Sequence, residues 1–162
     1  ENYLGPQETY TKKQAIATAD RTPLTQLADP YNMVLLYSNL YLDENIQLIC
    51  HIVPEIKKFI FIGDARQINQ TNNLDIRNKL KKTHPNVEYQ FITPQDMTTN
   101  QLLDSLYFVD PKTTGVLFSS WFYKTTFAGN TSLVSNAHKL IGTTAAPYSL
   151  SIWRTSPKKT AE

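Results

Sequence analysis

The chain has 162 residues, of which 41% are hydrophobic and 19% are charged, and its formal net charge is +2. This length suffices for one domain with a hydrophobic core, and the apolar content excludes a disordered chain. Lys79, Lys81 and Lys82 form the one basic cluster, which is typical of a solvated helix end, so we expect no nucleic-acid partner. A single cysteine, Cys50, excludes an internal disulfide.

The chain divides by composition into three parts. Residues 1–32 are polar and interrupted by prolines, which predicts a lead-in or linker with a short helix at residues 12–19. We expect an α/β domain over residues 33–153, which opens with a strand-like apolar run at residues 34–37. A polar tail occupies residues 154–162.

Four further segments have the patterns of β-strands. Residues 59–62 and 115–118 are apolar at consecutive positions, which is typical of central strands in a parallel sheet that is covered on both faces. Residues 87–91 alternate between apolar and polar side chains, which favours a half-exposed strand at the edge of the sheet. Residues 148–152 also alternate and are the last predicted strand.

Helices are predicted between these strands from capping residues and from the helical spacing of apolar side chains. Asp43 is the expected N-cap of the first helix, and Pro54 ends it. Thr98 opens a later helix with the pattern of a capping box. The two remaining helices are expected over residues 71–83 and from Thr131 or Ser132 to Gly142.

Alternating strands and helices predict parallel, right-handed βαβ units. We number the strands along the chain, with residues 59–62 as strand 1 and residues 148–152 as strand 4. Strand 2 has the pattern of an edge strand, whereas strands 1 and 3 have the pattern of buried strands, which implies the spatial order 2-1-3-4. We therefore expect a flavodoxin-like, three-layer α/β/α fold whose parallel sheet has four to five strands. In such sheets, ligands bind beyond the carboxyl ends of the strands, near the point where the strand order reverses.

Four residues that follow predicted strands are candidate ligand-binding residues: Asn39, Asp64, Trp121 and Tyr123. Asp64 either contacts a ligand or caps a turn through its side chain. The aromatic residues either stack on a ligand, bury against a partner, or pack against the last helix. We expect Asp64, Trp121 and Tyr123 to line the carboxyl edge of the sheet and to remain partly exposed.

The sequence predicts no catalytic residues, no metal site and no cofactor. Residues 63–67 do not form a GxGxxG or Walker A loop, so a flavin or nucleotide is not expected. His51, His84 and His138 are dispersed without a metal-ligand spacing, which favours structural roles. Ser119 follows the strand at which a phosphoacceptor receiver domain would place an aspartate.

Several segments together resemble a known family. Residues 42–49 and 53–62 resemble part of the second lobe of type I periplasmic binding proteins, the substrate-binding proteins of ABC transporters. In that family a helix ends at a proline, and a basic pair leads into the first strand of the second lobe. Residues 98–106 and 115–122 are similar to the next helix and strand of that lobe. Residues 146–148 are similar to the Pro-Val-Tyr approach to its last strand.

The resemblance implies a non-catalytic ligand-binding or sensing module. Domains of this kind also occur as extracytoplasmic sensors of two-component histidine kinases, so a histidine kinase is an expected parent protein. Its partner would be a small molecule or a partner protein domain, and a second copy of the chain is a further candidate. Two alternatives remain open: a small flavodoxin-like enzyme or phosphoacceptor domain, and a domain used only for dimerisation or interaction.

The composition also bears on location. Many Asn, Gln, Thr, Ser and Tyr residues at a modest charge favour an extracytoplasmic protein, on the periplasmic side of a bacterial membrane. No apolar stretch approaches the roughly 20 residues of a membrane helix. The chain starts at Glu1 without a signal peptide, which predicts a piece of a longer, membrane-anchored parent.

Overall fold

The computed structural model of the chain describes residues 3–28, 41–124, 131–133 and 149–151. The predicted strand at residues 34–37, together with Asn39, lies outside the described residues, as does most of the last predicted helix. Within the described parts, no helix is both long and apolar enough to cross a membrane.

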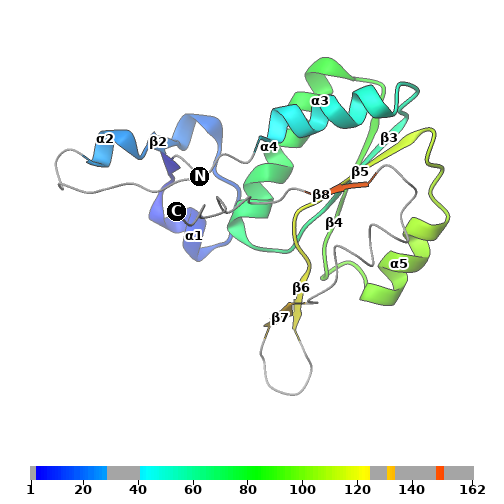
Figure 1. Cartoon of the computed structure of the whole chain (residues 1–162). Helices are drawn as coiled ribbons and strands as arrows, with labels where there is room; N and C mark the ends of the chain where they lie inside the picture. Colours follow the sequence, from blue (N-terminus) through cyan, green and yellow to red (C-terminus); the bar gives the residue numbers. More distant parts are fainter. Residues whose placement is uncertain (1–2, 29–40, 125–130, 134–148, 152–162) are drawn as a thin grey trace, which may run out of the picture.

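A parallel sheet lies among α3, α4 and α5, in the right-hand part of Figure 1. Strand β3 (Lys58–Ile62) lies between β4 (Glu88–Ile92) and β5 (Thr114–Phe118), and it pairs with both in parallel. A short segment, β8 (Ser149–Ser151), pairs in parallel with the other side of β5. The predicted α/β class with a parallel sheet is therefore confirmed.

One face of the sheet packs against α3 (Leu42–Ile52) and α4 (Gln67–Thr83). Alternation along the strands turns Phe59, Phe61 and Leu117 to this face, where all three are buried. The helices bury four side chains against them: Ile46, Ile49, Ile76 and Leu80.

The opposite face packs against α5 (Thr99–Tyr107). The alternate strand residues Ile60, Ile62, Val116 and Phe118 meet Leu102 and Leu106 of the helix in a second apolar cluster. The central strands are thus covered on both faces, which explains why residues 59–62 and 115–118 are apolar at consecutive positions.

The helix starts show two different capping arrangements. Thr98 and Gln101 form the predicted capping box of α5, because the Thr98 side chain accepts from the Gln101 N–H and the Gln101 side chain accepts from the Thr98 N–H. The prediction that Asp43 caps α3 is wrong. Tyr41 occupies the N-cap with a left-handed backbone (φ 47°) and no side-chain cap, which places Asp43 in the first turn. In the first turn, its carboxylate still interacts favourably with the positive end of the helix dipole.

After the sheet, the chain forms a small antiparallel hairpin. Strand β6 (Phe122–Lys124) pairs with β7 (Thr131–Leu133) in the register Tyr123↔Ser132. The prediction that a helix starts at Thr131 or Ser132 is therefore wrong. Thr and Ser suit a helix N-cap, but a β-branched Thr also suits a strand, and pairing with β6 decides between the two.

The N-terminal segment contains β1 (Tyr3–Leu4), α1 (Gln7–Thr11), a 3-10 turn (Thr18–Asp20), β2 (Thr22–Pro23) and α2 (Thr25–Ala28). The helix predicted at residues 12–19 does not form; α1 ends before it, and Lys13 is left-handed (φ 53°). β1 and β2 pair antiparallel, and Figure 1 draws β2 close to α2.

Specific contacts join this segment to α4, where the sequence predicted a lead-in or linker. Ile16 is 0% exposed, and its N–H donates to the Thr71 hydroxyl at 3.0 Å. Arg21 forms an ion pair with Asp75 at 2.6 Å. Part of the segment is therefore folded against the domain.

Candidate functional site

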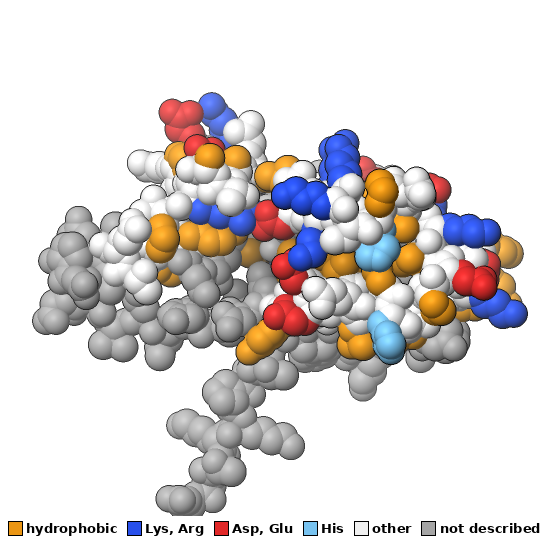
Figure 2. Space-filling model, turned by 90° about the horizontal axis from the view of Figure 1, so that it is seen from above, with side chains coloured by type: hydrophobic (Ala, Val, Ile, Leu, Met, Phe, Trp, Pro, Cys, Tyr) orange, Lys and Arg blue, Asp and Glu red, His pale blue; other side chains and the backbone are white. Residues whose placement is uncertain are grey.

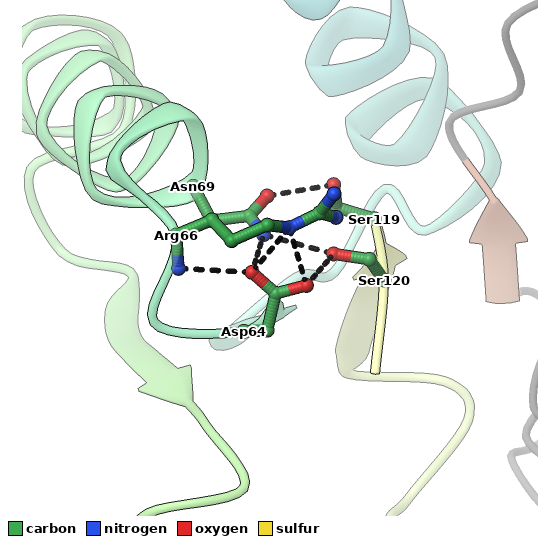
Figure 3. Close-up of polar contacts among 5 residues, drawn as sticks. All are labelled: Asp64, Arg66, Asn69, Ser119 and Ser120. Atoms are coloured by element: carbon green, nitrogen blue, oxygen red, sulfur yellow. Dashed lines mark hydrogen bonds and ion pairs between the residues drawn. The ribbon is translucent and has the colours of Figure 1, made fainter. Parts of the chain in front are cut away.

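Two loops meet at the carboxyl edge of the sheet. β3 ends at Ile62 and is followed by Gly63 and Asp64, while β5 ends at Phe118 and is followed by Ser119 and Ser120. Because the two strands are adjacent and parallel, both loops emerge at the same edge. Figure 3 shows the polar side chains that they bring together, with two more from the start of α4.

The Asp64 carboxylate is the centre of this polar cluster, which consists of Asp64, Arg66, Asn69, Ser119 and Ser120. Asp64 is only 2% exposed. Its Oδ1 accepts from the Arg66 backbone N–H at 2.9 Å, from Arg66 Nε at 2.9 Å and from Asn69 Nδ2 at 2.8 Å. Its Oδ2 accepts from Arg66 Nε at 2.9 Å and from the Ser120 hydroxyl at 2.7 Å. A buried carboxylate without such donors would be strongly destabilising.

Asn69 links the two loops across the top of the sheet. It lies in the first turn of α4 and is fully buried. Its Nδ2 also donates to the Ser120 hydroxyl at 2.8 Å, and its Oδ1 accepts from the Ser119 hydroxyl at 2.8 Å. The amide therefore fixes the loop after β5 relative to the start of α4.

The electrostatics of the cluster favour the ionised form of Asp64. Burial raises the pKa of this carboxyl group, but the hydrogen bonds from Arg66 and Ser120 and the charge of Arg66 lower it more, so the pKa lies below its ordinary value. At neutral pH the cluster thus holds a carboxylate paired with the Arg66 guanidinium, whose side chain is 54% exposed.

The structure corrects the expected exposure of two candidate residues. Asp64 lies at the carboxyl edge as predicted, but it is buried, because its partners come from α4 and from the loop after β5. Trp121 is 1% exposed instead of partly exposed. Its ring belongs to the apolar cluster under α5, and its Nε1–H donates to the Thr99 hydroxyl at 3.0 Å.

For the other two candidate residues, Tyr123 and Asn39, the described part of the chain gives no contact with the cluster. Tyr123 is the middle residue of β6, and its side chain is outside the part of the chain that the structure describes. Asn39 lies outside the described residues.

The sequence did not identify Arg66, Asn69, Ser119 and Ser120 as partners of Asp64. A usable signal existed, since polar residues follow two strands that were both predicted to be central. Loops after neighbouring parallel strands share one edge of the sheet, so a carboxylate in one loop and hydroxyls in the other are expected to meet.

The hydrogen bonds of the cluster fix its charged groups in position. Both oxygens of Asp64 are engaged by donors, so the carboxylate is held as a structural anion. The half-exposed Arg66 is the cluster's charged group at the surface. Among the residues that the structure describes, no three His, Cys, Asp or Glu side chains gather into a metal-ligating group.

Comparisons with known proteins identified no relative of this chain. A scan against protein-family models, a search of curated proteins and a search of solved structures each found no match for this chain.

Proposed function

We propose that this chain is a non-catalytic ligand-binding module of the sensor type, and that its ligand contacts the carboxyl edge of the sheet between β3 and β5. The observation that carries the proposal is Arg66, a half-exposed guanidinium that a buried carboxylate orients at this edge. A guanidinium fixed by Asp64 loses little further side-chain freedom when it binds an acceptor group.

The topology supports this position for a ligand. From β3 the chain crosses to β4 on one side, and it then returns to β5 on the other side. The two connections therefore lie on opposite sides of β3. Ligands of open α/β sheets bind at the point where such connections separate. We include in the proposal the flavodoxin-like sheet order 2-1-3-4 and three-layer architecture.

The ligand that suits this edge is a small polar molecule with a carboxylate or several hydroxyl groups. Arg66 would donate to it, and the partly buried Ser119 hydroxyl lies in the same cluster. We further propose, from the sequence resemblance, an extracytoplasmic setting in a larger, membrane-anchored protein such as a histidine kinase.

A thermal-shift screen of monosaccharides, amino acids and small carboxylic acids tests the proposed site. Ligands that stabilise the chain should lose most of that effect in Arg66→Gln, because the variant cannot offer the charged donor. Lys112→Gln is the matched control, since Lys112 is an exposed cation near the opposite, amino end of β5. A ligand that stabilises the Arg66 variant as much as the unmodified chain would contradict the proposed position.

A second candidate function is self-association, which one surface feature favours. Tyr107 and Phe108 at the end of α5 are 72% and 84% exposed, and their rings meet edge to face with centroids 5.4 Å apart. Large exposed aromatic side chains are common at protein interfaces. Light scattering over a concentration series tests it: a dimer that Tyr107→Ser with Phe108→Ser converts to a monomer would favour this function.

A further inference from the structure

A pocket of about 430 Å³ lies on the flank of the sheet, between α4 and the edge strand β4. This volume falls within the roughly 300–1,000 Å³ that is typical of small-molecule sites. It arises because β4 is at the edge of the described sheet and α4 covers only part of its face. The pocket is separate from the polar cluster at the carboxyl edge and shares no residue with it.

The floor of the pocket is aromatic and held in place. Tyr89 and Phe91 of β4 are half-buried. The Tyr89 hydroxyl donates to Asn73 Oδ1 of α4 at 2.7 Å, and its ring lies 6.5 Å from that of Phe59. Phe91 stacks on Phe61 with centroids 5.2 Å apart. The floor is therefore preformed, which lowers the entropy lost when a flat ligand binds.

The rim of the pocket is basic. Arg77, Lys81 and His84 all line it, and their spacing of four and three residues puts them on one face of α4 and its end. None of the described lining residues is acidic. Within the described parts of the chain, neither Arg77 nor Lys81 forms an ion pair with a carboxylate, whereas Lys79 of the same helix contacts Asp43 at 3.0 Å.

The electrostatic character of the floor fits the same ligand. Burial raises the pKa of Tyr89, although the nearby charge of Arg77 lowers it, so the phenol is neutral at physiological pH. The pocket thus combines a neutral aromatic floor with a positive rim.

We propose that this pocket binds a small aromatic anion, with its ring against Tyr89 and Phe91 and its negative group at Arg77 and Lys81. Offset or edge-to-face ring contacts stabilise a flat ligand on such a floor. The planar guanidinium of Arg77 matches a carboxylate, sulfonate or phosphate group, and the Lys81 ammonium adds a second donor. This site would be additional to the one at the carboxyl edge, and it does not depend on that proposal.

A fluorescence titration with 8-anilinonaphthalene-1-sulfonate, a compact aromatic anion, tests the proposal on the 162-residue chain. The double variant Arg77→Gln with Lys81→Gln should bind this probe about tenfold more weakly, the size expected for two partly screened charge interactions. Lys82→Gln with Lys112→Gln removes the same charge from exposed positions outside the pocket and should stay within about twofold of the unmodified chain. An uncharged analogue, N-phenyl-1-naphthylamine, should bind all three proteins equally.

Each outcome decides the matter. Equal losses in both double variants would mean that the probe responds only to net charge, and no loss in the pocket variant would mean that it binds elsewhere; either result overturns the proposal. Amide chemical shifts during the same titration give a test that needs no variant. Changes concentrated in residues 77–91 support the pocket, whereas changes centred on Asp64 and Ser120 overturn it. Thermal unfolding checks that all variants are folded.

Discussion

The carboxyl-edge cluster and the α4–β4 pocket hold charge in opposite ways. In the cluster, the Asp64 carboxylate is buried, and both of its oxygens accept hydrogen bonds from Arg66, Asn69 or Ser120 of the same cluster. In the pocket, Arg77 and Lys81 are exposed on a helix face above half-buried rings. The first arrangement fixes two loops relative to each other, whereas the second leaves charge facing solvent. Substitution of the buried Asp64 should therefore mainly lower stability, whereas substitution of the exposed pocket cations should weaken binding with little effect on stability.

The largest expected effect is at Trp121, next to the cluster. Trp121→Ala removes a fully buried ring and its hydrogen bond to Thr99, so the free energy of unfolding should fall by about 3–5 kcal/mol. Urea denaturation measures this, with Tyr107→Ala as an exposed aromatic control. A loss below about 1 kcal/mol would return Trp121 to the exposed position that its sequence context predicted.

Asp64→Ala should have the next largest effect. It leaves Arg66, Asn69 and Ser120 without their shared acceptor, and we expect about 2 kcal/mol of lost stability, less than for a fully buried ion pair because Arg66 is half exposed. Asp104→Ala, on the exposed side of α5, is the control in the same denaturation experiment. If both variants unfolded alike, the cluster would not be a stabilising network.

Acid should remove the contribution of Asp64 gradually. Its folded-state pKa lies below the ordinary value of about 3.9, so its stabilisation is present above that value and is lost as the pH falls through the folded pKa. Unfolding curves from pH 6 to pH 2 should show the gap between the unmodified chain and Asp64→Asn narrowing at the acid end. A gap that stays constant would mean that Asp64 is not the titrating group.

The smallest effect is expected for the pocket cations. Arg77→Gln with Lys81→Gln should change the free energy of unfolding by no more than about 0.5 kcal/mol, because exposed side chains away from packed features contribute little. The same denaturation series measures it. A larger loss would assign these cations a structural role and would narrow the contrast between the two regions.

The central strands and their helices could be predicted because their signals are local. Residues 59–62 and 115–118 are apolar at every position, which burial on two faces explains, and the capping box of α5 needs only Thr98 and Gln101. The alternation of residues 87–91 likewise predicts a strand at the edge of the sheet, and among the described strands β4 (Glu88–Ile92) pairs with β3 alone.

What the sequence did not reveal depends on contacts between distant residues. Asp64 and Ser120 are 56 residues apart, and only the adjacency of β3 and β5 joins them. The position of Trp121 after a strand predicts partial exposure at the carboxyl edge, but α5 supplies Thr99 and an apolar surface for its ring. Pairing with β6 likewise decides the conformation of Thr131.

The contact between Ile16 and α4 also has a consequence in time. Ile16 and Thr71 are 55 residues apart, so at synthesis rates of about 5–20 residues per second Ile16 is made roughly 3 to 11 seconds before its partner. During that interval its backbone N–H lacks the Thr71 hydroxyl that accepts from it in the folded chain. A chaperone that covers Ile16 on the ribosome would delay docking of the N-terminal segment, but it would leave β3, β4 and β5 free to pair, because that sheet takes no residue from the segment.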